Sequence, residues 1–292
     1  MSYKIALIGN CQAKPLAVLL KKLNPKIKIT KVAIVHLLSS EQEHLYEKSF
    51  AEADLIIAQQ VADNYPCEFV RDNQLKEKYG DKIFSIINLY YTGYTPDLMY
   101  IRMSDRRTLR GPLGDYHNKT IFNAWKNGCT LTECCKQYLS VEFNKDMYNG
   151  LSDASLAELK KREDLSSISI VDFLKENLHH SRMFYTFNHP SNILLEKMSR
   201  EIISKMEISG DNKYGNLPEF LDQFIPPVNC FSMSELGIKF KNVPEFKGVQ
   251  FSYGENDRIV TGKQKYYCLD EVIRCFYDIY DRNHEELIDK LL

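Results

Sequence analysis

A cysteine near the start of the chain lies where a strand gives way to a helix. Residues 4–8 (KIALI) contain four apolar residues in a row, the pattern of a strand buried on both faces of a parallel sheet, and Gly9-Asn10-Cys11-Gln12-Ala13 follows at once. Backbone N–H groups at a helix start have no partner within the helix, and their field favours a thiolate. The sequence therefore predicts a lowered pKa for Cys11, which makes it a candidate nucleophile.

The residues around Cys11 suit the same chemistry. Pro15 is tolerated only in the first turn of a helix, so the helix should begin near residues 12–14. Gly9 allows a sharp turn, and the side chains of Asn10 and Gln12 can donate hydrogen bonds to a developing oxyanion. The alternative is a small buried cysteine after an ordinary strand-to-helix turn, and residues 9–13 alone favour this alternative.

A histidine later in the chain has a similar setting. Residues 183–187 (MFYTF) predict another strand, and Pro190 should be the first residue of a helix that runs to about Met206. His189 would then lie at the N-cap of this helix and at the carboxyl end of a strand. Because two such turns can meet at one edge of a sheet, we expect Phe184 in the sheet of residues 5–8 and His189 within reach of Cys11. A satisfied structural histidine is the alternative.

The N-terminal third alternates strands and helices. Strands are predicted within 27–38, 54–58 and 82–87, and the segments 40–53 and 68–79 between them are helical. This alternation predicts βαβ units and therefore an α/β fold, a parallel β-sheet flanked by helices. Asn10, Gln60 and Asn88 each follow a strand, so they should gather at the carboxyl edge, where open α/β sheets bind ligands. Capping of loop backbone is the alternative for each of them.

An arginine cluster lies in the middle of the chain, between a tyrosine-rich loop (89–97) and the motif GPLGDYH (111–117). Charge-assisted hydrogen bonds and ring stacking from such a segment suit a phosphorylated ligand with a flat ring. The alternative is a solvated helix face on which Asp105 and Asp115 pair with arginines. The four arginines are Arg102, Arg106, Arg107 and Arg110. The residues expected to contact the ligand are Arg107, Arg110, Tyr116 and His117.

The rest of the chain predicts further helices and an irregular tail. Capping-box patterns at 155–158 and 169–172 open two helices within a helical insert of about 115–180. Residues 207–265 have the composition of loops, and a closing amphipathic helix follows. We therefore expect an α/β catalytic domain over 1–206 and an irregular and helical C-terminal extension over 207–292 that packs on the same domain.

The overall composition argues against several classes of function. Lys and Arg total 38 against 39 Asp and Glu, so no global charge favours nucleic acid or a membrane surface. No apolar run is long enough to span a bilayer or to form a secretion signal. The eight cysteines lack the C-x-x-C pairs of a zinc site, so no metal is predicted. A soluble, cytoplasmic, reduced protein is expected.

Three motifs together resemble a known family. The Gly9-to-Ala13 turn, the GPLGDYH motif and the segment 186–190 (TFNHP) are similar in order and spacing to WcbI-type polysaccharide biosynthesis proteins, over about residues 3–206. This resemblance implies a coenzyme A-binding protein that acts as an acetyltransferase, O-acetylating capsule sugars in bacteria. It also implies that His189 is the matching histidine of the family and that its signature turn is formed by Gly9, Asn10, Cys11 and Gln12.

The first turn also resembles, more distantly, the first block of SGNH-type esterases and sugar acetyltransferases. In those enzymes Gly-Asp-Ser follows strand one, whereas this chain has Asn10 for the acid and Cys11 for the serine. They also carry an aspartate three residues before the histidine, where this chain has Thr186. The comparison thus leaves a Cys11–His189 dyad, or His189 acting directly as the base.

Taken with the candidate residues, the resemblance implies transfer of an acyl group from acyl-coenzyme A (acetyl-coenzyme A) to a hydroxyl of a sugar or oligosaccharide. In a direct route His189 deprotonates the hydroxyl, and in a covalent route Cys11 is acylated first. Gly9, Gln12 and Gln60 are expected at the coenzyme, with Arg107 and Arg110 at its phosphates. The alternatives are an SGNH-like esterase or thioesterase, in which water replaces the sugar, and a non-catalytic module that binds a nucleotide or coenzyme A.

Overall fold

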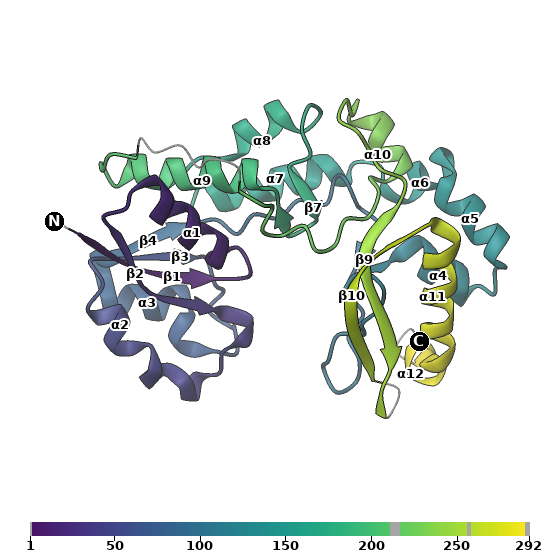
Figure 1. The fold of residues 1–292 in the computed structure, drawn as a ribbon, viewed down its shortest axis with the longest axis horizontal. Coiled ribbons are helices and arrows are strands. Elements are labelled where there is room, and N and C mark those ends of the chain that lie inside the picture. Colours follow the sequence, from purple (N-terminus) through teal and green to yellow (C-terminus); the bar gives the residue numbers. More distant parts are fainter. Residues whose placement is uncertain (1, 211–216, 256–257, 290–292) are drawn as a thin grey trace. The chain divides into compact units, whose positions relative to one another are not determined.

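The computed structural model describes residues 2–210, 217–255 and 258–289, and the chain forms two compact units (Figure 1). The first unit comprises 1–90, 156–176 and 189–220, and the second comprises 91–155, 177–188 and 221–292. The units therefore interleave along the chain instead of dividing near residue 206, because the middle segments pack with the C-terminal residues. Within the described ranges, no helix is both long and apolar enough to cross a membrane.

The first unit is built on a four-stranded parallel sheet, which confirms the predicted α/β fold. The sheet has the order β2-β1-β3-β4, and β1 pairs in parallel with both β2 and β3. Residues 5–8 of the central strand are at most 1% exposed, as expected of a strand covered on both faces. The strands are β1 (Tyr3–Gly9), β2 (Ile27–Ile34), β3 (Leu55–Gln59) and β4 (Ile83–Ile86).

Helix α1 (Ala13–Leu23) begins where Pro15 predicts, and its leucines face the protein interior. It packs against β1, β2 and α9 (Asn192–Lys205). The other helices that contribute to this unit are α2 (Glu47–Ala51), α3 (Asp72–Tyr79), α7 (Leu151–Glu163) and α8 (Val171–Asn177). Short 3₁₀ helices lie at Val35–Leu37, Ser40–Leu45, Glu68–Val70 and Gly80–Lys82.

The prediction of a fifth sheet strand containing Phe184 is wrong. Residues Phe184–Thr186 form a short strand, β7, that belongs to the second unit and is not a strand of the parallel sheet. Phe184 is fully buried there, 5.8 Å from the ring of Tyr91. An apolar run of this length fills a core equally well inside a sheet or beside aromatic rings, and periodicity does not distinguish the two.

The predicted N-cap position of His189 is also wrong. Helix α9 begins at Asn192 with Ser191 as its N-cap, and His189 and Pro190 form the two-residue strand β8. The difference lies at Pro190, which is paired in β8 instead of forming the first helical turn, so the helix begins two residues later than predicted.

The second unit combines helices with a β-hairpin. Strands β9 (Phe246–Tyr253) and β10 (Ile259–Tyr267) pair antiparallel, so the expectation that 207–265 is mostly loop is wrong over these strands. Helix α11 (Leu269–Arg282) is the predicted closing amphipathic helix, and it packs on α4 and α5. The remaining elements are β5 (Leu98–Met99), β6 (His117–Asn118), α4 (Lys119–Lys126), α5 (Leu131–Leu139), α6 (Val141–Tyr148), α10 (Cys230–Glu235) and α12 (His284–Asp289).

A buried carboxyl group organises this second unit. Oδ2 of Asp97 accepts hydrogen bonds from the side-chain amides of Asn118 at 2.7 Å and Asn229 at 3.3 Å. The same two asparagines cap α4 and α10, because their side-chain oxygens accept from the N–H groups of Ile121 and Phe231. Burial raises the pKa of Asp97 above its usual value. One carboxyl group thus ties the loop before β5 to the starts of two helices.

This arrangement predicts different outcomes for two replacements of Asp97. Asp97→Ala should lower the free energy of unfolding by about 3 kcal/mol, since two buried amides lose their acceptor. Asp97→Asn keeps an acceptor oxygen and should remain within about 1 kcal/mol of the wild type at neutral pH. Urea unfolding of both variants measures these changes.

The pH dependence tests the same idea independently. A raised folded-state pKa contributes stability that is fully present below the unfolded value of about 3.9 and is lost as the pH rises through the folded value. Relative to the wild type, Asp97→Asn should therefore become more stable as the pH increases from about 4 to 7. Equal destabilisation by Asn and Ala at both pH values would contradict the prediction, because the amide would then fail to replace the carboxyl group even where Asp97 is protonated.

Candidate functional site

The turn after β1 is held by hydrogen bonds among amides from three strand ends. The N–H of Asn10 donates to Oε1 of Gln59 at 2.7 Å, and Nδ2 of Asn10 donates to Oδ1 of Asn88 at 2.8 Å. Oδ1 of Asn10 accepts from the N–H of Gln12 at 2.9 Å, which stabilises the start of α1. Asn10 therefore joins the carboxyl ends of β1, β3 and β4.

Gln12 is fully buried and supports this turn from the interior. Its Nε2 donates to the carbonyl of Leu89 at 2.8 Å, while its Oε1 accepts from Nε2 of Gln59 at 2.9 Å and from the N–H of Leu89 at 3.2 Å. These contacts make Gln12 a positioning residue, in place of the predicted role of a direct oxyanion donor.

A cavity of about 260 Å³ lies at this edge of the sheet. Asn10, Gln60 and Asn88 all line it, which confirms that these residues gather at the carboxyl edge. Gly9 also lines it, and a Cβ there would lie 2.6 Å from Oε1 of Gln59, so no larger residue fits. The other lining residues are Val35, His36, Gln59, Val61, Ala62 and Tyr65.

The chemistry of this lining suits a neutral polar ligand. Among the described residues that line the cavity, four carry side-chain amides and none is Lys, Arg, Asp or Glu. Amides both donate and accept hydrogen bonds, whereas Val35, Val61 and Tyr65 offer apolar surface. Ligand groups such as amides, hydroxyls and short alkyl chains complement these walls.

Arg162 of α7 lies behind this edge, a position that the sequence did not reveal. Its Nη1 donates to the carbonyl of Asn88 at 3.3 Å, and its own carbonyl accepts from Nε2 of Gln60 at 3.0 Å. Burial lowers the pKa of its guanidinium. In sequence, Glu158 and Arg162 have the spacing of an ordinary helical ion pair, so nothing local marks this contact with the sheet edge.

The predicted low pKa of Cys11 is wrong in this structure. Burial raises the pKa of the thiol to about 11, and the backbone N–H groups of Cys11 and Gln12 oppose that shift without overcoming it. The helix-start effect is thus present in the expected direction, and desolvation of the charged form is larger. Cys11 is predominantly a thiol near neutral pH.

His189 lies in the same unit as Cys11, and burial lowers the pKa of its imidazole to about 4. Helices α1 and α9 pack side by side, and Nδ2 of Asn24, just after α1, donates to the carbonyl of Ser209, just after α9, at 2.8 Å. Because their carboxyl ends meet, the two helices run in the same direction. The segments that lead into them, with Cys11 and His189, lie at the same end of the pair.

Two residues of the GPLGDYH motif have structural roles in the second unit. His117 is fully buried. Its Nδ1 lies 2.9 Å from the hydroxyl of Tyr280, and its Nε2 lies 3.0 Å from the carbonyl of Leu109. Tyr116 is buried among aromatic rings, and its hydroxyl donates to Oδ1 of Asn188 at 2.6 Å. The structure therefore places both in a core, whereas the sequence predicted them as ligand contacts.

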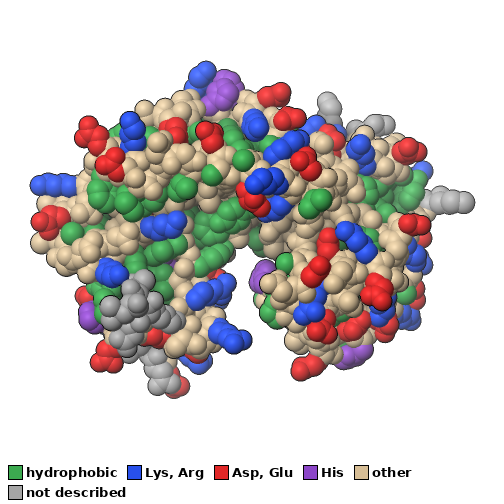
Figure 2. Space-filling model, turned by 180° about the vertical axis from the view of Figure 1, so that it is seen from behind, with side chains coloured by type: hydrophobic (Ala, Val, Ile, Leu, Met, Phe, Trp, Pro, Cys, Tyr) green, Lys and Arg blue, Asp and Glu red, His purple; other side chains and the backbone are tan. Residues whose placement is uncertain are grey.

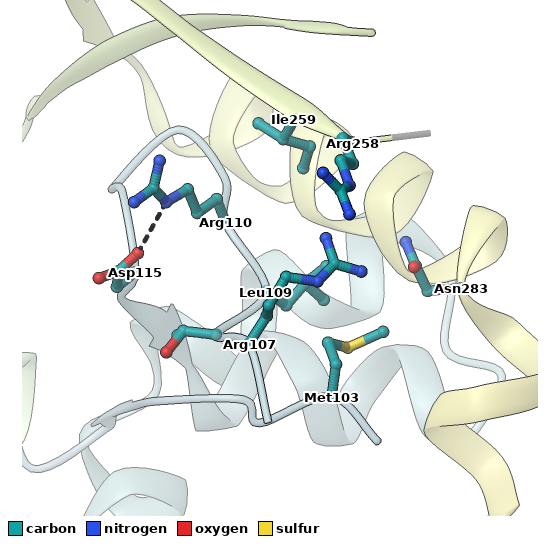
Figure 3. Close-up of a pocket in the computed structure, with 9 residues that line it drawn as sticks. Met103, Arg107, Leu109, Arg110, Asp115, Arg258, Ile259 and Asn283 are labelled. Carbon is teal, nitrogen blue, oxygen red and sulfur yellow. Dashed lines mark hydrogen bonds and ion pairs between the residues drawn. The ribbon is translucent and has the colours of Figure 1, made fainter. Parts of the chain in front are cut away.

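Arg107 and Arg110 do line a cavity, and it lies within the second unit (Figure 3). Arg110 donates to Asp115 at 3.1 Å, and Arg107 forms an ion pair with Asp105, as the alternative of paired aspartates predicted. Both arginine side chains are 55% exposed. A third guanidinium, that of Arg258, joins them from the chain just before β10, far away in sequence.

Comparison with known proteins supports the resemblance in the motifs. No curated protein matched the sequence. A solved structure that is 18% identical aligns over 98% of this chain and 91% of its own, with a TM-score of 0.74. That protein is described as WcbI, a novel polysaccharide biosynthesis enzyme, in a native form without a disulfide bond between coenzyme A and one of its cysteines. This likeness shows that the two proteins share a fold, which extends beyond residue 207.

The family model of the polysaccharide biosynthesis enzyme WcbI matches residues 4–211. This range covers more than half of the chain and includes the Gly9-to-Ala13 turn, the GPLGDYH motif and His189. The chain therefore belongs to the WcbI family of polysaccharide biosynthesis enzymes.

Proposed function

We propose that this protein transfers an acyl group from acyl-coenzyme A to a hydroxyl of a sugar or oligosaccharide in the cytoplasm. The family supports a step in polysaccharide biosynthesis, and the description of the related solved structure names coenzyme A together with a cysteine. The observation that carries the proposal is that Cys11 and His189 lead into two helices that run side by side in the same direction.

The cavity at the sheet edge supports a position for the acyl donor. The pantetheine arm of coenzyme A is neutral and carries two amides, a hydroxyl and two methyl groups. Such an arm complements side-chain amides beside the apolar surface of Val35 and Val61. Gln60 would bind it directly, and Gly9 would provide the space for its approach. Gln12 would act from behind by fixing Gln59.

In the direct route, the oxygen of the acceptor hydroxyl attacks the carbonyl carbon of the thioester as His189 takes the hydroxyl proton. The carbon–sulfur bond then breaks, and the leaving thiolate of coenzyme A recovers a proton from the imidazolium. Asn10 lines the cavity, and the second N–H of its side-chain amide can donate to the oxyanion that forms between these steps.

The charge states of the two side chains favour this route over acylation of Cys11. Acylation of Cys11 would proceed through its thiolate, and burial raises the pKa of this thiol to about 11, so the reactive form is scarce at neutral pH. An imidazole with a pKa of about 4 is neutral at physiological pH but weakly basic, so His189 would accept the hydroxyl proton only as the new carbon–oxygen bond forms. We assign Cys11 to the binding of the thioester and His189 to proton transfer.

Substitution of each residue separates the routes. His189→Ala should lower kcat by roughly 10²–10⁴-fold, the usual effect of losing a general base, whereas Cys11→Ser should retain most of the activity. Release of the coenzyme A thiol from acetyl-coenzyme A, measured with and without acceptor sugars, distinguishes transfer from hydrolysis. Cys268→Ser, at an exposed thiol, serves as the control. Loss of activity in Cys11→Ser equal to that in His189→Ala would instead support the covalent route.

The reactivity of Cys11 provides a second test. Because its pKa is about 11, only roughly 10⁻⁴ of the thiol is ionised at neutral pH, so iodoacetamide should modify it slowly and about tenfold faster with each added pH unit. Coenzyme A should protect it, while exposed Cys268 should react equally with and without the ligand. Peptide mapping by mass spectrometry reports both sites. Rapid modification of Cys11 near pH 7 would contradict the assignment of a neutral thiol.

A further inference from the structure

The arginine-lined cavity of the second unit has a chemistry opposite to that of the cavity beside Asn10. It has a volume of about 400 Å³ and receives three guanidinium groups from two segments of the chain. Arg107 and Arg110 lie on either side of Leu109, and Arg258 precedes β10. The other lining residues are Met103, Thr108, Asp115, Ile259 and Asn283.

Among the described residues that line this cavity, three arginines outnumber the one carboxylate, that of Asp115. Asp105 and Asp115 face three arginines, and Asp105 already interacts with both Arg107 and Arg258, which lower its pKa. Figure 3 shows the guanidinium groups of Arg107 and Arg258 pointing toward one another across the cavity. Like charges in this arrangement repel, and an anion between them would remove that repulsion. On the face drawn in Figure 2, by contrast, basic and acidic side chains are interspersed.

The two existing ion pairs would yield to a stronger anion. The pairs Arg107–Asp105 and Arg110–Asp115 are about half exposed, and exposed pairs contribute little to stability. A diphosphate group carries about two negative charges against the one of a carboxylate, and its oxygens match the planar fork of arginine with two parallel hydrogen bonds. Neutral donors are also available, because the Thr108 hydroxyl accepts from Arg102 at 2.7 Å and keeps its own proton to donate.

Buried contacts hold the arginine-bearing segment in place. The N–H of Leu109 donates to the carbonyl of Ile101 at 2.8 Å, and the carbonyl of Leu109 lies 3.0 Å from Nε2 of His117. Since a carbonyl can only accept, Nε2 carries the proton and Nδ1 accepts from the hydroxyl of Tyr280. His117 is therefore a positioning residue that fixes the backbone between Arg107 and Arg110.

We infer that this cavity binds the diphosphate group of a substrate, with Arg107, Arg110 and Arg258 as its ligands. This inference deepens the proposed acyl transfer and rests on it for the identity of the substrate. Diphosphates occur both in coenzyme A and in sugars activated as nucleoside diphosphates, so either the acyl donor or the acceptor can supply the group. The neutral cavity at the sheet edge is unsuited to it, because no cationic side chain lines that cavity among the residues described there.

Calorimetry with the full-length protein and three probes tests this site. Inorganic pyrophosphate should bind to the wild type with an affinity that falls as salt increases. Arg258→Ala and Arg107→Ala should each weaken binding by roughly ten- to a hundredfold, the effect of losing a hydrogen bond to a charged group. Arg258→Lys should recover only part of the affinity, since lysine lacks the planar fork. Arg274→Ala, at an exposed arginine outside the cavity, is the matched control.

Competition identifies the source of the diphosphate. Displacement of pyrophosphate by coenzyme A assigns the cavity to the acyl donor, and displacement by a uridine diphosphate sugar assigns it to the acceptor. Absence of pyrophosphate binding to a folded wild-type protein, displacement by neither ligand, or equal affinity in Arg258→Ala would overturn the inference. The protection of Cys11 by coenzyme A is measured separately, so a failure here is distinguishable from a failure of the proposed acyl transfer.

Discussion

The constraint on which the first unit depends is the satisfaction of buried amides at the end of β1. Gln12 is fully buried, and an unsatisfied buried amide costs about 1–3 kcal/mol, so its partners Gln59 and Leu89 are fixed in turn. Gln59 also accepts from the N–H of Asn10, at a distance that only Gly9 permits. The turn that carries Cys11, the start of α1 and the walls of the cavity are therefore one connected arrangement, in which the replacement of one amide disturbs the others.

The same burial decides the chemistry of the candidate catalytic groups. A helix start favours a thiolate, and the sequence is sufficient to predict that start. The burial of a side chain, however, depends on the tertiary fold. For Cys11 and His189, desolvation is the largest cause of the pKa shift, and in both it favours the neutral form. A neutral thiol and a neutral imidazole suit a reaction in which the proton comes from the acceptor hydroxyl. Burial opposes the imidazolium of His189 in either route, and nucleophilic attack by Cys11 would require the thiolate in addition, which burial also opposes.

Sequence patterns predicted those features that local physics determines. The βαβ alternation and the polar residues after each strand were sufficient to predict the parallel sheet and the gathering of Asn10, Gln60 and Asn88 at its edge. Patterns failed where burial against a distant segment decides the outcome. Phe184 packs beside Tyr91 instead of entering the sheet. The buried ring of His117 forms hydrogen bonds with the carbonyl of Leu109 and the hydroxyl of Tyr280. Arg258 escaped prediction because no local pattern links it to Arg107.

The interleaving of the two units changes how the C-terminal part of the chain is understood. The hairpin segment contributes Arg258 to the arginine-lined cavity, and α11 contributes the tyrosine that orients His117 beneath Leu109. The residues after 207 therefore complete the lining of a cavity whose other residues lie in the middle of the sequence. Likeness in fold to the WcbI structure over 98% of the chain is consistent with this view. Arg107 and Arg110 are each paired with an aspartate, so their charges are balanced. The excess positive charge among the described residues of the cavity therefore comes from Arg258, which the C-terminal segment supplies.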